Sequence, residues 1–334
     1  MRRFRSPHLG LVAALAVAAG VPAAAVAAAP ASAAITRYTI TDLGSLGGGV
    51  TDATAINAAG QVTGNSTLTL GGSRAFVWSK GKMTDLGTLP GGDFSMGREI
   101  NGSGEVAGSA TDPDEISHPS LWKGKSITAF QPGSGPLAIN DSGQFIGRCG
   151  VNVCEISNGT QTALPIPPHF ILCGPVAISN NGQVLGNCEV TNRVNDWHGV
   201  VWANGTPTVL PTLGGTVATS TTALPLATAI NNNGQVTGTA VTSTGALDGF
   251  SFSNGTITDL GPTFSPAAIN DNGVIVGGQF IDSNGMLQNL NNLIPAGSGF
   301  KIRSATGIND NGQIIANAID TATGQQHALL LTPS

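Results

Sequence analysis

Few residues of this 334-residue chain have side chains suited to chemistry, and one small group stands out. Glu99 follows Arg98 directly, and Asp93 lies a short distance before them. A carboxylate beside a guanidinium can act as an acid or contact a ligand. Local neutralisation by Arg98, or a solvated wall, would explain the same residues without a ligand. We treat Arg98, Glu99 and Asp93 as candidate ligand-binding residues and assign no catalytic residue.

Histidines form a second set of candidates because three of them share one position of a repeat described below. His118 and His198 each stand four residues before a tryptophan, and His327 stands four before the equivalent leucine. Such residues, with Asp196 beside His198, could contribute to a polar rim that binds a ligand. Alternatively, each histidine satisfies backbone groups at the end of its strand. Because the three lie in different repeats, we expect no shared zinc ion, and the sequence predicts no metal or other cofactor.

The cysteines predict two disulfides, Cys149–Cys154 and Cys173–Cys188. A hairpin centred on residues 180 and 181 would place residue 173 opposite residue 188, within reach of a disulfide. A bulge at Gly182 would shift this pairing by one residue. A four-cysteine zinc site is the alternative, but the spacing lacks the usual pairs of close ligands.

Composition and motifs exclude several functions. The sequence contains no G-x-S-x-G, Walker loop, H-E-x-x-H or dinucleotide fingerprint. Only 10% of residues are charged, with 14 Lys and Arg against 19 Asp and Glu, which excludes a basic groove for nucleic acid. Asn270–Gly273 and Asn309–Gly312 resemble part of a calcium loop but lack its downstream carboxylate, so we interpret them as turns. Three aspartates recur at one repeat position and indicate a structural hydrogen bond: Asp42, Asp85 and Asp259.

The elements that must position these residues follow from an internal repeat. The pattern A-I-N-x-x-G-x-V-x-G occurs, with variations, seven times. Its third position is filled in turn by Asn57, Asn101, Asn140, Ser179, Asn231, Asn270 and Asn309. Most copies continue with an apolar segment around Phe or Trp and then with a segment such as Thr-Asp-Leu-Gly. Each unit therefore predicts four short strands, a to d, joined by tight turns such as Asn-Gly.

Four-stranded units of about 40 residues are typical of β-propellers. Residues 38–44 read as a strand d without a preceding a, b and c, whereas the last unit supplies only a, b and c. We therefore predict an all-β, seven-bladed β-propeller over residues 35–334, with the N-terminal strand completing the C-terminal blade. Strand a is expected to be innermost because the position two before the Asn is Ala or Gly in every copy except Glu99. An open β-solenoid is the alternative fold.

Residues 1–34 predict a removable signal peptide. Arg2, Arg3 and Arg5 precede an uncharged apolar run from Leu9 to Val26, and Ala31-Ser32-Ala33 matches a signal-peptidase site. An uncleaved membrane anchor is the alternative. With the leader removed, we expect a secreted or envelope protein without membrane insertion.

The alternation of A-I-N-x-x-G-Q-V-x-G with A-F-x-W and T-D-L-G resembles the HAF-repeat family of exported bacterial proteins. The two half-motifs are clearest at 42–108 and 249–277, and the resemblance covers essentially the whole mature chain. No unit contains a literal His-Ala-Phe, and units three and six are degenerate. The resemblance implies an extracellular or envelope location and a repeat-built β fold, and it carries over no catalytic residue.

Three functions remain open. The first is a monomeric, non-catalytic propeller that binds a protein or glycan through the b–c and d–a connections, which share one face and vary in length. Its longest loops are Asp112–Pro119, Asn187–His198 and Gly214–Leu226. The second is a structural envelope or matrix protein. The third is an enzyme acting on an extracellular glycan or ester. In every case we expect Trp78, Trp122, Trp202 and Phe252 to be mostly buried between blades.

Overall fold

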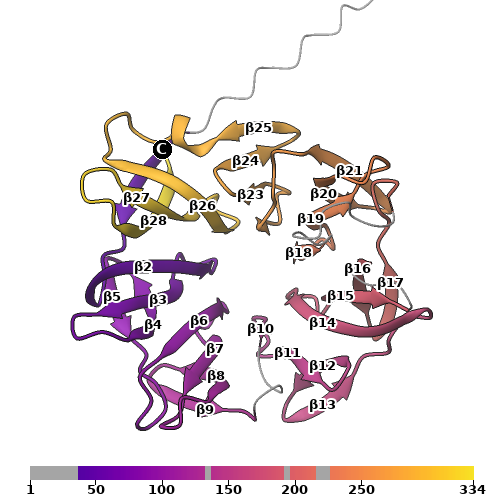
Figure 1. Cartoon of the computed structure of the whole chain (residues 1–334), viewed down its shortest axis with the longest axis horizontal. Coiled ribbons are helices and arrows are strands. Elements are labelled where there is room, and N and C mark those ends of the chain that lie inside the picture. The colour runs from indigo at the N-terminus through magenta and orange to yellow at the C-terminus, as the bar shows by residue number, and fades with distance from the viewer. Residues whose placement is uncertain (1–36, 132–136, 192–195, 216–225) are drawn as a thin grey trace, which may run out of the picture. The chain divides into compact units, whose positions relative to one another are not determined.

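The computed structural model describes residues 37–131, 137–191, 196–215 and 226–334. The compact unit runs from Thr36 to Ser334, and its strands form seven four-stranded antiparallel sheets arranged in a ring (Figure 1). The predicted all-β, seven-bladed propeller is confirmed. The predicted leader, residues 1–34, lies outside the described residues.

Each of the first six blades is a simple meander whose strands follow the chain in the order a, b, c, d. Blade 1 consists of β2 (Gly47–Ile56), β3 (Val62–Leu68), β4 (Ser73–Ser79) and β5 (Lys82–Asp85). Blade 2 consists of β6 (Ser95–Ile100), β7 (Val106–Thr111), β8 (Ser117–Lys123) and β9 (Ser126–Ala129). Blade 3 consists of β10 (Ala138–Ile139), β11 (Phe145–Cys149), β12 (Asn152–Ser157) and β13 (Thr160–Ala163).

The next three blades repeat this plan. Blade 4 consists of β14 (Phe170–Ile178), β15 (Val184–Val190), β16 (Trp197–Ala203) and β17 (Thr206–Val209). Blade 5 consists of β18 (Ala227–Ile230), β19 (Val236–Val241), β20 (Leu247–Ser253) and β21 (Thr256–Gly261). Blade 6 consists of β22 (Ala268–Ile269), β23 (Ile275–Gly277), β24 (Phe280–Ser283) and β25 (Met286–Asn289). Strand a is only two residues long in blades 3 and 6, the two units whose sequences are degenerate.

Blade 7 joins the two ends of the ring. It contains β26 (Phe300–Ile308), β27 (Ile314–Asp320) and β28 (Gln326–Pro333), and its outer strand is β1 (Tyr38–Asp42). In this pair Tyr38 lies opposite Pro333 and Asp42 lies opposite Leu329. The indigo β1 therefore lies beside the yellow C-terminal strand, as the sequence predicts (Figure 1). A short 3-10 helix, η1 (Leu290–Asn292), precedes β26. No helix among the described residues has the length and apolarity needed to cross a bilayer.

Strand a is the innermost strand of each blade, and in five blades it contains a β-bulge. The extra residues are Thr54, Arg98, Val176, Thr228 and Thr306. A bulge interrupts the alternation of side chains and redirects them. Each extra residue therefore lines the channel together with the residue that follows it, as the pair Thr54 and Ala55 illustrates.

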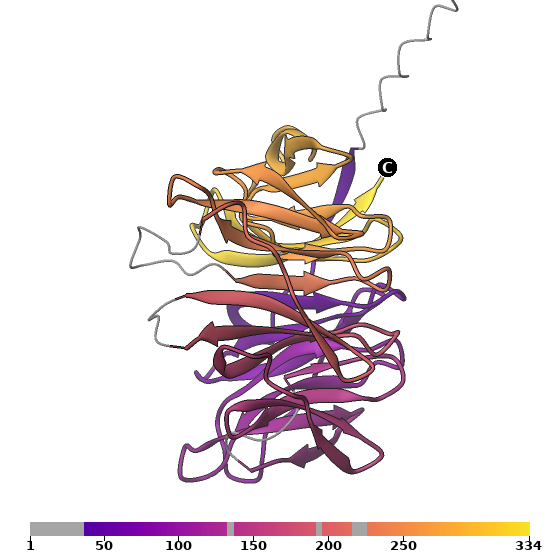
Figure 2. The same ribbon diagram turned by 90° about the vertical axis from the view of Figure 1, so that its right-hand side faces the viewer.

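The c–d connections of blades 1 to 6 are two-residue turns, with Asn-Gly in blades 3 to 6, Lys-Gly in blade 1 and Gly-Lys in blade 2. In blade 4, Asn204 has a φ of 50° and Gly205 has a φ of 76°. Two consecutive residues with positive φ are typical of the type I′ hairpin turn, which asparagine and glycine adopt most readily. The a–b and c–d turns share one face of the ring, and the b–c and d–a connections share the other. Figure 2 shows the ring edge-on, with the connections along its two sides.

Large side chains of strand c fill the space between blades. Trp78, Trp122 and Trp202 are buried, as predicted. Phe252, at the same repeat position, is mostly buried and packs against its cluster. In that blade the fully enclosed ring belongs to Phe250, two residues earlier. All four side chains are therefore mostly buried, as predicted.

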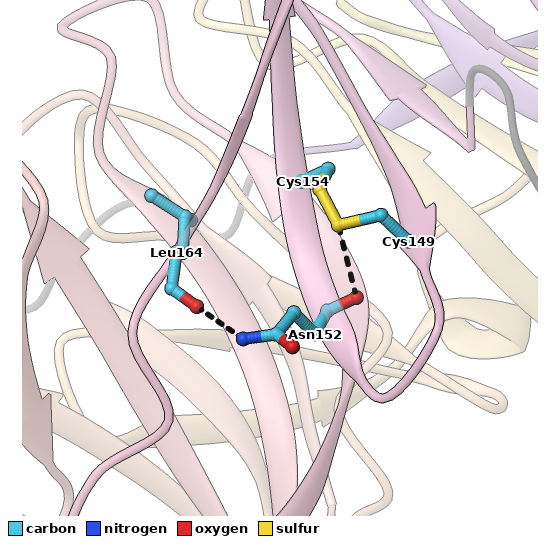
Figure 3. The surroundings of a disulfide bond; sticks show 4 residues. All are labelled: Cys149, Asn152, Cys154 and Leu164. Atoms are coloured by element: carbon cyan, nitrogen blue, oxygen red, sulfur yellow. Dashed lines mark hydrogen bonds between the residues drawn. A yellow bond between two sulfur atoms is a disulfide. The ribbon is translucent and has the colours of Figure 1, made fainter.

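Both predicted disulfides are present, in blades 3 and 4. Cys149 and Cys154 join β11 to β12, with 5.8 Å between their Cα atoms (Figure 3). Close by, Asn152 Nδ2 donates a hydrogen bond to the Leu164 carbonyl at 2.9 Å. The second bridge joins Cys173 to Cys188, directly opposite on β14 and β15.

The register behind the second bridge differs from the one we predicted. Next to the turn, Ile178 lies opposite Val184, one residue away from the predicted pairing. The bulge at Val176 then shifts the strand back by one residue and restores Cys173 to its place opposite Cys188. The predicted pairing is therefore correct, but it depends on a bulge inside the strand.

Candidate functional site

The seven inner strands enclose a central channel built in layers. A layer of seven isoleucines surrounds its middle: Ile56, Ile100, Ile139, Ile178, Ile230, Ile269 and Ile308. The isoleucines and the polar residues that follow them line a cavity of about 190 Å³ at one mouth. A second cavity of about 190 Å³ lies between the isoleucines and the layer of alanine and glycine. A third, of about 350 Å³, lies towards the other mouth.

The repeated asparagine at the end of strand a has a structural role. Asn57 Oδ1 accepts hydrogen bonds from the backbone N–H groups of Ala59 and Gln61, at 3.1 and 2.9 Å, and so closes its own turn. Its Nδ2 donates to the Asn101 carbonyl of the next blade at 2.9 Å. Five other asparagines make the same contact with the next blade: Asn101, Asn140, Asn231, Asn270 and Asn309. The seventh position is Ser179, whose shorter hydroxyl accepts from Gln183 N–H.

The residues after these asparagines form a second chain of hydrogen bonds around the first mouth. Asp271 illustrates the pattern, because its Oδ1 accepts from the Asn232 N–H while its own N–H donates to Asp310 Oδ1, each at 2.8 Å. The chain also includes Asp141 and Asn180. Its acceptor oxygens are therefore engaged in joining blades. This geometry agrees with our interpretation of the Asn-Asp-Asn-Gly segments as turns.

The recurrent aspartates at the end of strand d are also structural. Asp42 Oδ1 accepts from the Gly44 N–H at 3.0 Å. The equivalent bonds of Asp85 and Asp259 are both 2.7 Å long. Each carboxylate therefore fixes the start of the connection to the next blade.

Glu99 and Arg98 interrupt this regular pattern at the other end of the channel. Both residues belong to β6, and the bulge at Arg98 makes both of them line the third cavity. Glu99 occupies the layer that is alanine or glycine in the other six blades. Burial raises the pKa of Glu99 to about 7, although the nearby Arg98 guanidinium lowers it. Arg98 is exposed.

The walls of this cavity come from four neighbouring blades. They consist of Thr54 from blade 1, Met96, Arg98 and Glu99 from blade 2, Leu137 from blade 3, and Pro175 and Val176 from blade 4. Within the ranges that the structure describes, neither the Arg98 nor the Glu99 side chain makes a hydrogen bond or an ion pair.

Asp93, which we grouped with these two residues, does not line the cavity. It is exposed on the connection between β5 and β6. Its Oδ1 accepts a hydrogen bond from Thr111 Oγ1 at 3.4 Å, and its backbone carbonyl accepts one from Arg74 Nη1. The predicted grouping of three residues is therefore corrected to two, because Asp93 precedes the strand whose bulge directs Arg98 and Glu99 inward.

The candidate histidines lie in separate pairs, each with a carboxylate. His118 Nε2 lies 2.9 Å from Asp112 Oδ2, and its Nδ1 lies 3.2 Å from the Phe130 carbonyl. The hydrogen bond with Asp112 raises the pKa of His118, and the contact with Phe130 adds to this effect. His198 Nε2 lies 3.1 Å from Asp196 Oδ1.

The third histidine follows the same rule: His327 Nδ1 lies 2.8 Å from Asp42 Oδ2. The three pairs belong to blades 2, 4 and 7, so the described structure does not assemble them into one centre. Each pair ties strand c to a neighbouring segment of its own blade.

Exposed aliphatic side chains mark the face that carries the b–c and d–a connections. Leu70, at the tip between β3 and β4, is 99% exposed. Ile116 and Val151 occupy the corresponding connections of blades 2 and 3, and Ile171 lies at the start of strand a in blade 4. We call Leu70, Ile116, Val151 and Ile171 the apolar arc. Val50, at the start of strand a in blade 1, is 37% exposed on the same face.

The remaining large apolar side chains that are exposed in the described structure lie elsewhere. Val209, Met286 and Leu287 belong to the outer strands β17 and β25. The repeat pattern did not predict the apolar arc. The sequence nevertheless contains a signal for such exposed residues, namely an aliphatic residue within a turn, as in Thr-Leu-Gly-Gly around Leu70.

The predicted long loops lie only partly within the described residues. Asp112–Pro119 is described and lies on the same face as the apolar arc. Residues 192–195 of the second predicted loop and 216–225 of the third lie outside the described ranges.

Fold and site together define a seven-bladed β-propeller with a closed ring, a layered channel and one ionisable pair, Arg98 and Glu99, in the third cavity. Comparisons with protein-family profiles and with curated proteins find no match. Among solved structures, YCF48 bound to a D1 peptide is similar at 11% identity and a TM-score of 0.52, over 91% of this chain and 99% of that one. This likeness supports the fold alone.

Two other solved structures are similar at lower scores. A puromycin hydrolase mutant gives 13% identity and a TM-score of 0.49, over 83% of this chain and 53% of that one. TolB from Acinetobacter baumannii gives 12% identity and a TM-score of 0.45, over 82% of this chain and 63% of that one. This chain therefore spans less than two thirds of either protein.

Proposed function

We propose that this protein is an exported, non-catalytic β-propeller that binds a partner protein through the face that carries the apolar arc. The observation that carries the proposal is the exposure of aliphatic side chains in four consecutive blades on the face with the longer connections. Apolar side chains exposed on one face of a protein favour an interaction surface on that face. Because the arc contains only aliphatic residues, we favour a protein over a glycan.

The absence of catalysis is part of the proposal. The histidine–carboxylate pairs of the described residues lie in separate blades, and Asp93 lies away from the channel. Acid–base catalysis requires titratable groups that converge on one substrate position. Among the described residues that line the third cavity, Glu99 and Arg98 are the ionisable ones, and they supply a single carboxyl group. The aspartates at the opposite mouth accept hydrogen bonds that join blades.

Export is supported by three features. The two disulfides are typical of oxidising compartments. Residues 1–34 have the pattern of a signal peptide, and the repeat resembles the HAF-repeat family of exported proteins. We propose that the mature protein acts as a monomer outside the cytoplasm or in the envelope.

Site-specific photo-crosslinking in the producing cells tests the proposed surface. A photoreactive phenylalanine analogue is placed at Leu70, Ile116 or Val151, and at Asn204 or Asn284 as controls on the opposite face. We expect adducts with the same protein at the three arc positions and none at the controls. Adducts confined to the controls would contradict the assignment of the face, and adducts with glycan only would contradict the choice of partner.

Matched substitutions then test the energetics. Ile116→Ser is expected to weaken binding of the crosslinked partner at least about tenfold if the side chain is buried on binding. Met286→Ser removes a similarly exposed apolar side chain from an outer strand and is expected to leave binding unchanged. Equal effects of the two variants would contradict the proposal.

Glu99 favours one alternative, an enzyme acting on an extracellular glycan or ester. A carboxyl group whose pKa is about 7 suits general acid–base work. Turnover of such a substrate by the wild type, abolished in Glu99→Gln, would replace the first proposal. If the protein has neither a partner nor a turnover, a structural role in the envelope or matrix is the remaining interpretation.

A further inference from the structure

The cavity beside Glu99 combines the features of a site for a small molecule. Its volume of about 350 Å³ falls in the usual range of such pockets, about 300–1,000 Å³. Its wall is apolar at Met96, Leu137, Pro175 and Val176. The carboxyl side chain of Glu99 and the cationic side chain of Arg98 both line this cavity. Most small-molecule pockets have this composition, an apolar wall with a few polar groups that fix orientation.

The side chains of Arg98 and Glu99 make no hydrogen bond or ion pair with the described residues, although the charge of Arg98 lowers the pKa of Glu99. Every other blade builds this layer with alanine or glycine, so the fold does not require a carboxyl group here. By contrast, the carboxylates at the opposite mouth accept backbone hydrogen bonds that join blades. The Glu99 side chain is partly exposed to the cavity and makes no hydrogen bond there, so its carboxyl group is open to a ligand. Glu99 is therefore better explained by a ligand than by stability.

We propose that this cavity binds a small zwitterion with an apolar side chain, the simplest being a free aliphatic α-amino acid. Its ammonium group would contact Glu99, and its carboxylate would contact Arg98, at the more exposed position. Its side chain would pack against Met96, Leu137 and Pro175. Opposite charges on consecutive residues of one bulge match a ligand that carries both charges close together. This site is independent of the proposed protein-binding surface.

Binding is linked to the protonation of Glu99. Among the described residues, Arg98 is the only other charged one that lines the third cavity. Asp141, Asp271 and Asp310 line the opposite mouth, beyond the isoleucine layer. An ammonium group favours the ionised form of Glu99, so binding lowers its pKa and releases a proton when the free carboxyl is protonated. Affinity should therefore rise as pH increases towards and through about 7.

Isothermal titration with L-leucine tests the site directly. We expect saturable binding, weakened about 10- to 100-fold for both N-acetyl-L-leucine, which lacks the ammonium group, and L-leucinamide, which lacks the carboxylate. Below pH 7, the heat should depend on the ionisation enthalpy of the buffer because a proton is released. Absence of saturation by about 10 mM leucine would overturn the proposal. Equal binding of leucine and leucinamide would also overturn it.

Two variants assign the effect to the cavity. Glu99→Ala restores the residue found in most other blades, so it should fold, and it is expected to reduce leucine affinity at least about tenfold and to abolish proton release. Asp93→Asn removes a nearby carboxylate outside the cavity and should change neither. Unchanged leucine binding in folded Glu99→Ala would overturn the proposal, even if a partner protein still binds the apolar arc.

Discussion

At the scale of single residues, Glu99 places a carboxyl group in the channel wall, where the equivalent residue of every other blade is alanine or glycine. The folded protein raises its pKa from 4.5 to about 7, so folding favours the neutral form. The stability that comes from keeping Glu99 neutral is therefore fully present below about pH 4.5. It is lost as pH rises through about 7, because the carboxyl group must then ionise in the channel. The difference between the two pKa values corresponds to about 3 kcal/mol.

We therefore expect Glu99→Gln to stabilise the protein at about pH 8.5, by up to about 3 kcal/mol, and to have little effect at about pH 4. The glutamine stays neutral at both values, whereas the glutamate must ionise within the channel at the higher one. Urea unfolding at the two pH values measures the difference. Asp93→Asn is the control, with a small effect at both. The same change in unfolding free energy at both values would contradict this account.

Two buried tryptophans at the same repeat position offer a matched comparison. Trp202 Nε1 donates a hydrogen bond to the Pro165 carbonyl at 2.8 Å. Trp122 Nε1 is buried and has no hydrogen-bond partner among the described residues. Replacing tryptophan by phenylalanine removes similar volume at both sites, but only Trp202→Phe leaves a carbonyl without its donor.

We expect Trp202→Phe to cost about 1–3 kcal/mol more than Trp122→Phe. Chemical unfolding of the two variants, each compared with the wild type, measures this difference. Trp122→Ala gives the scale of full truncation, about 3–5 kcal/mol for a buried ring. A larger cost for Trp122→Phe than for Trp202→Phe would show that cavity shape outweighs the hydrogen bond.

At the scale of elements, the a–b turn is both a hairpin and a contact between blades. Its asparagine closes the turn with one atom and reaches the next blade with another. Ser179 is the exception, since its hydroxyl closes the turn but does not make the contact with blade 5 that its counterparts make. The motif therefore connects local turn geometry to the assembly of the ring.

Ser179→Asn is expected to stabilise the protein by about 0.5–1.5 kcal/mol, because the new amide can reach the Asn231 carbonyl. Ser179→Ala is the matched control and should destabilise it by about 0.5–2 kcal/mol through loss of the turn-closing acceptor. Thermal and urea unfolding give both values. If Ser179→Asn were destabilising, the backbone at this position would differ from that of the other blades.

The repeat predicted the blades well because the hydrogen bonds that close each turn lie within its own unit. It did not predict the bulges, which depend on contacts with neighbouring strands. For this reason Arg98 and Glu99 both line the cavity, although simple alternation would place them on opposite sides of β6. The bulge at Val176 likewise preserved the Cys173–Cys188 pairing. The exposure of Leu70 could not be predicted from the repeat. The sequence shows an apolar residue in a turn, but it does not show whether another part of the ring covers that residue.

At the scale of the whole molecule, β1 is the only strand of blade 7 that comes from the other end of the chain. Its partner β28 would otherwise be an edge strand, which is open to pairing with another chain. Tyr38 and Leu43 are buried at the two ends of this contact. Closure therefore contributes both to stability and to the solubility of the ring.

Deleting residues 37–46 is expected to lower the unfolding midpoint and to cause association that depends on protein concentration. Analytical ultracentrifugation and thermal unfolding measure the two effects. A synthetic peptide of residues 37–46 should restore a monomer by pairing with β28, whereas a scrambled peptide should not. A deleted protein that stayed monomeric and equally stable without the peptide would show that β1 is dispensable.

The pairing of β1 with β28 also decides how the ring responds to force. Tyr38 and Pro333 face each other at one end of an antiparallel ladder, so the two outermost residues of the pair lie side by side. A force that pulls Tyr38 and Pro333 apart breaks the hydrogen bonds of this ladder one after another. In shear, by contrast, all of these hydrogen bonds would bear the load together. Stretched between these positions, the protein would open at this seam at low force, before any other blade unravels.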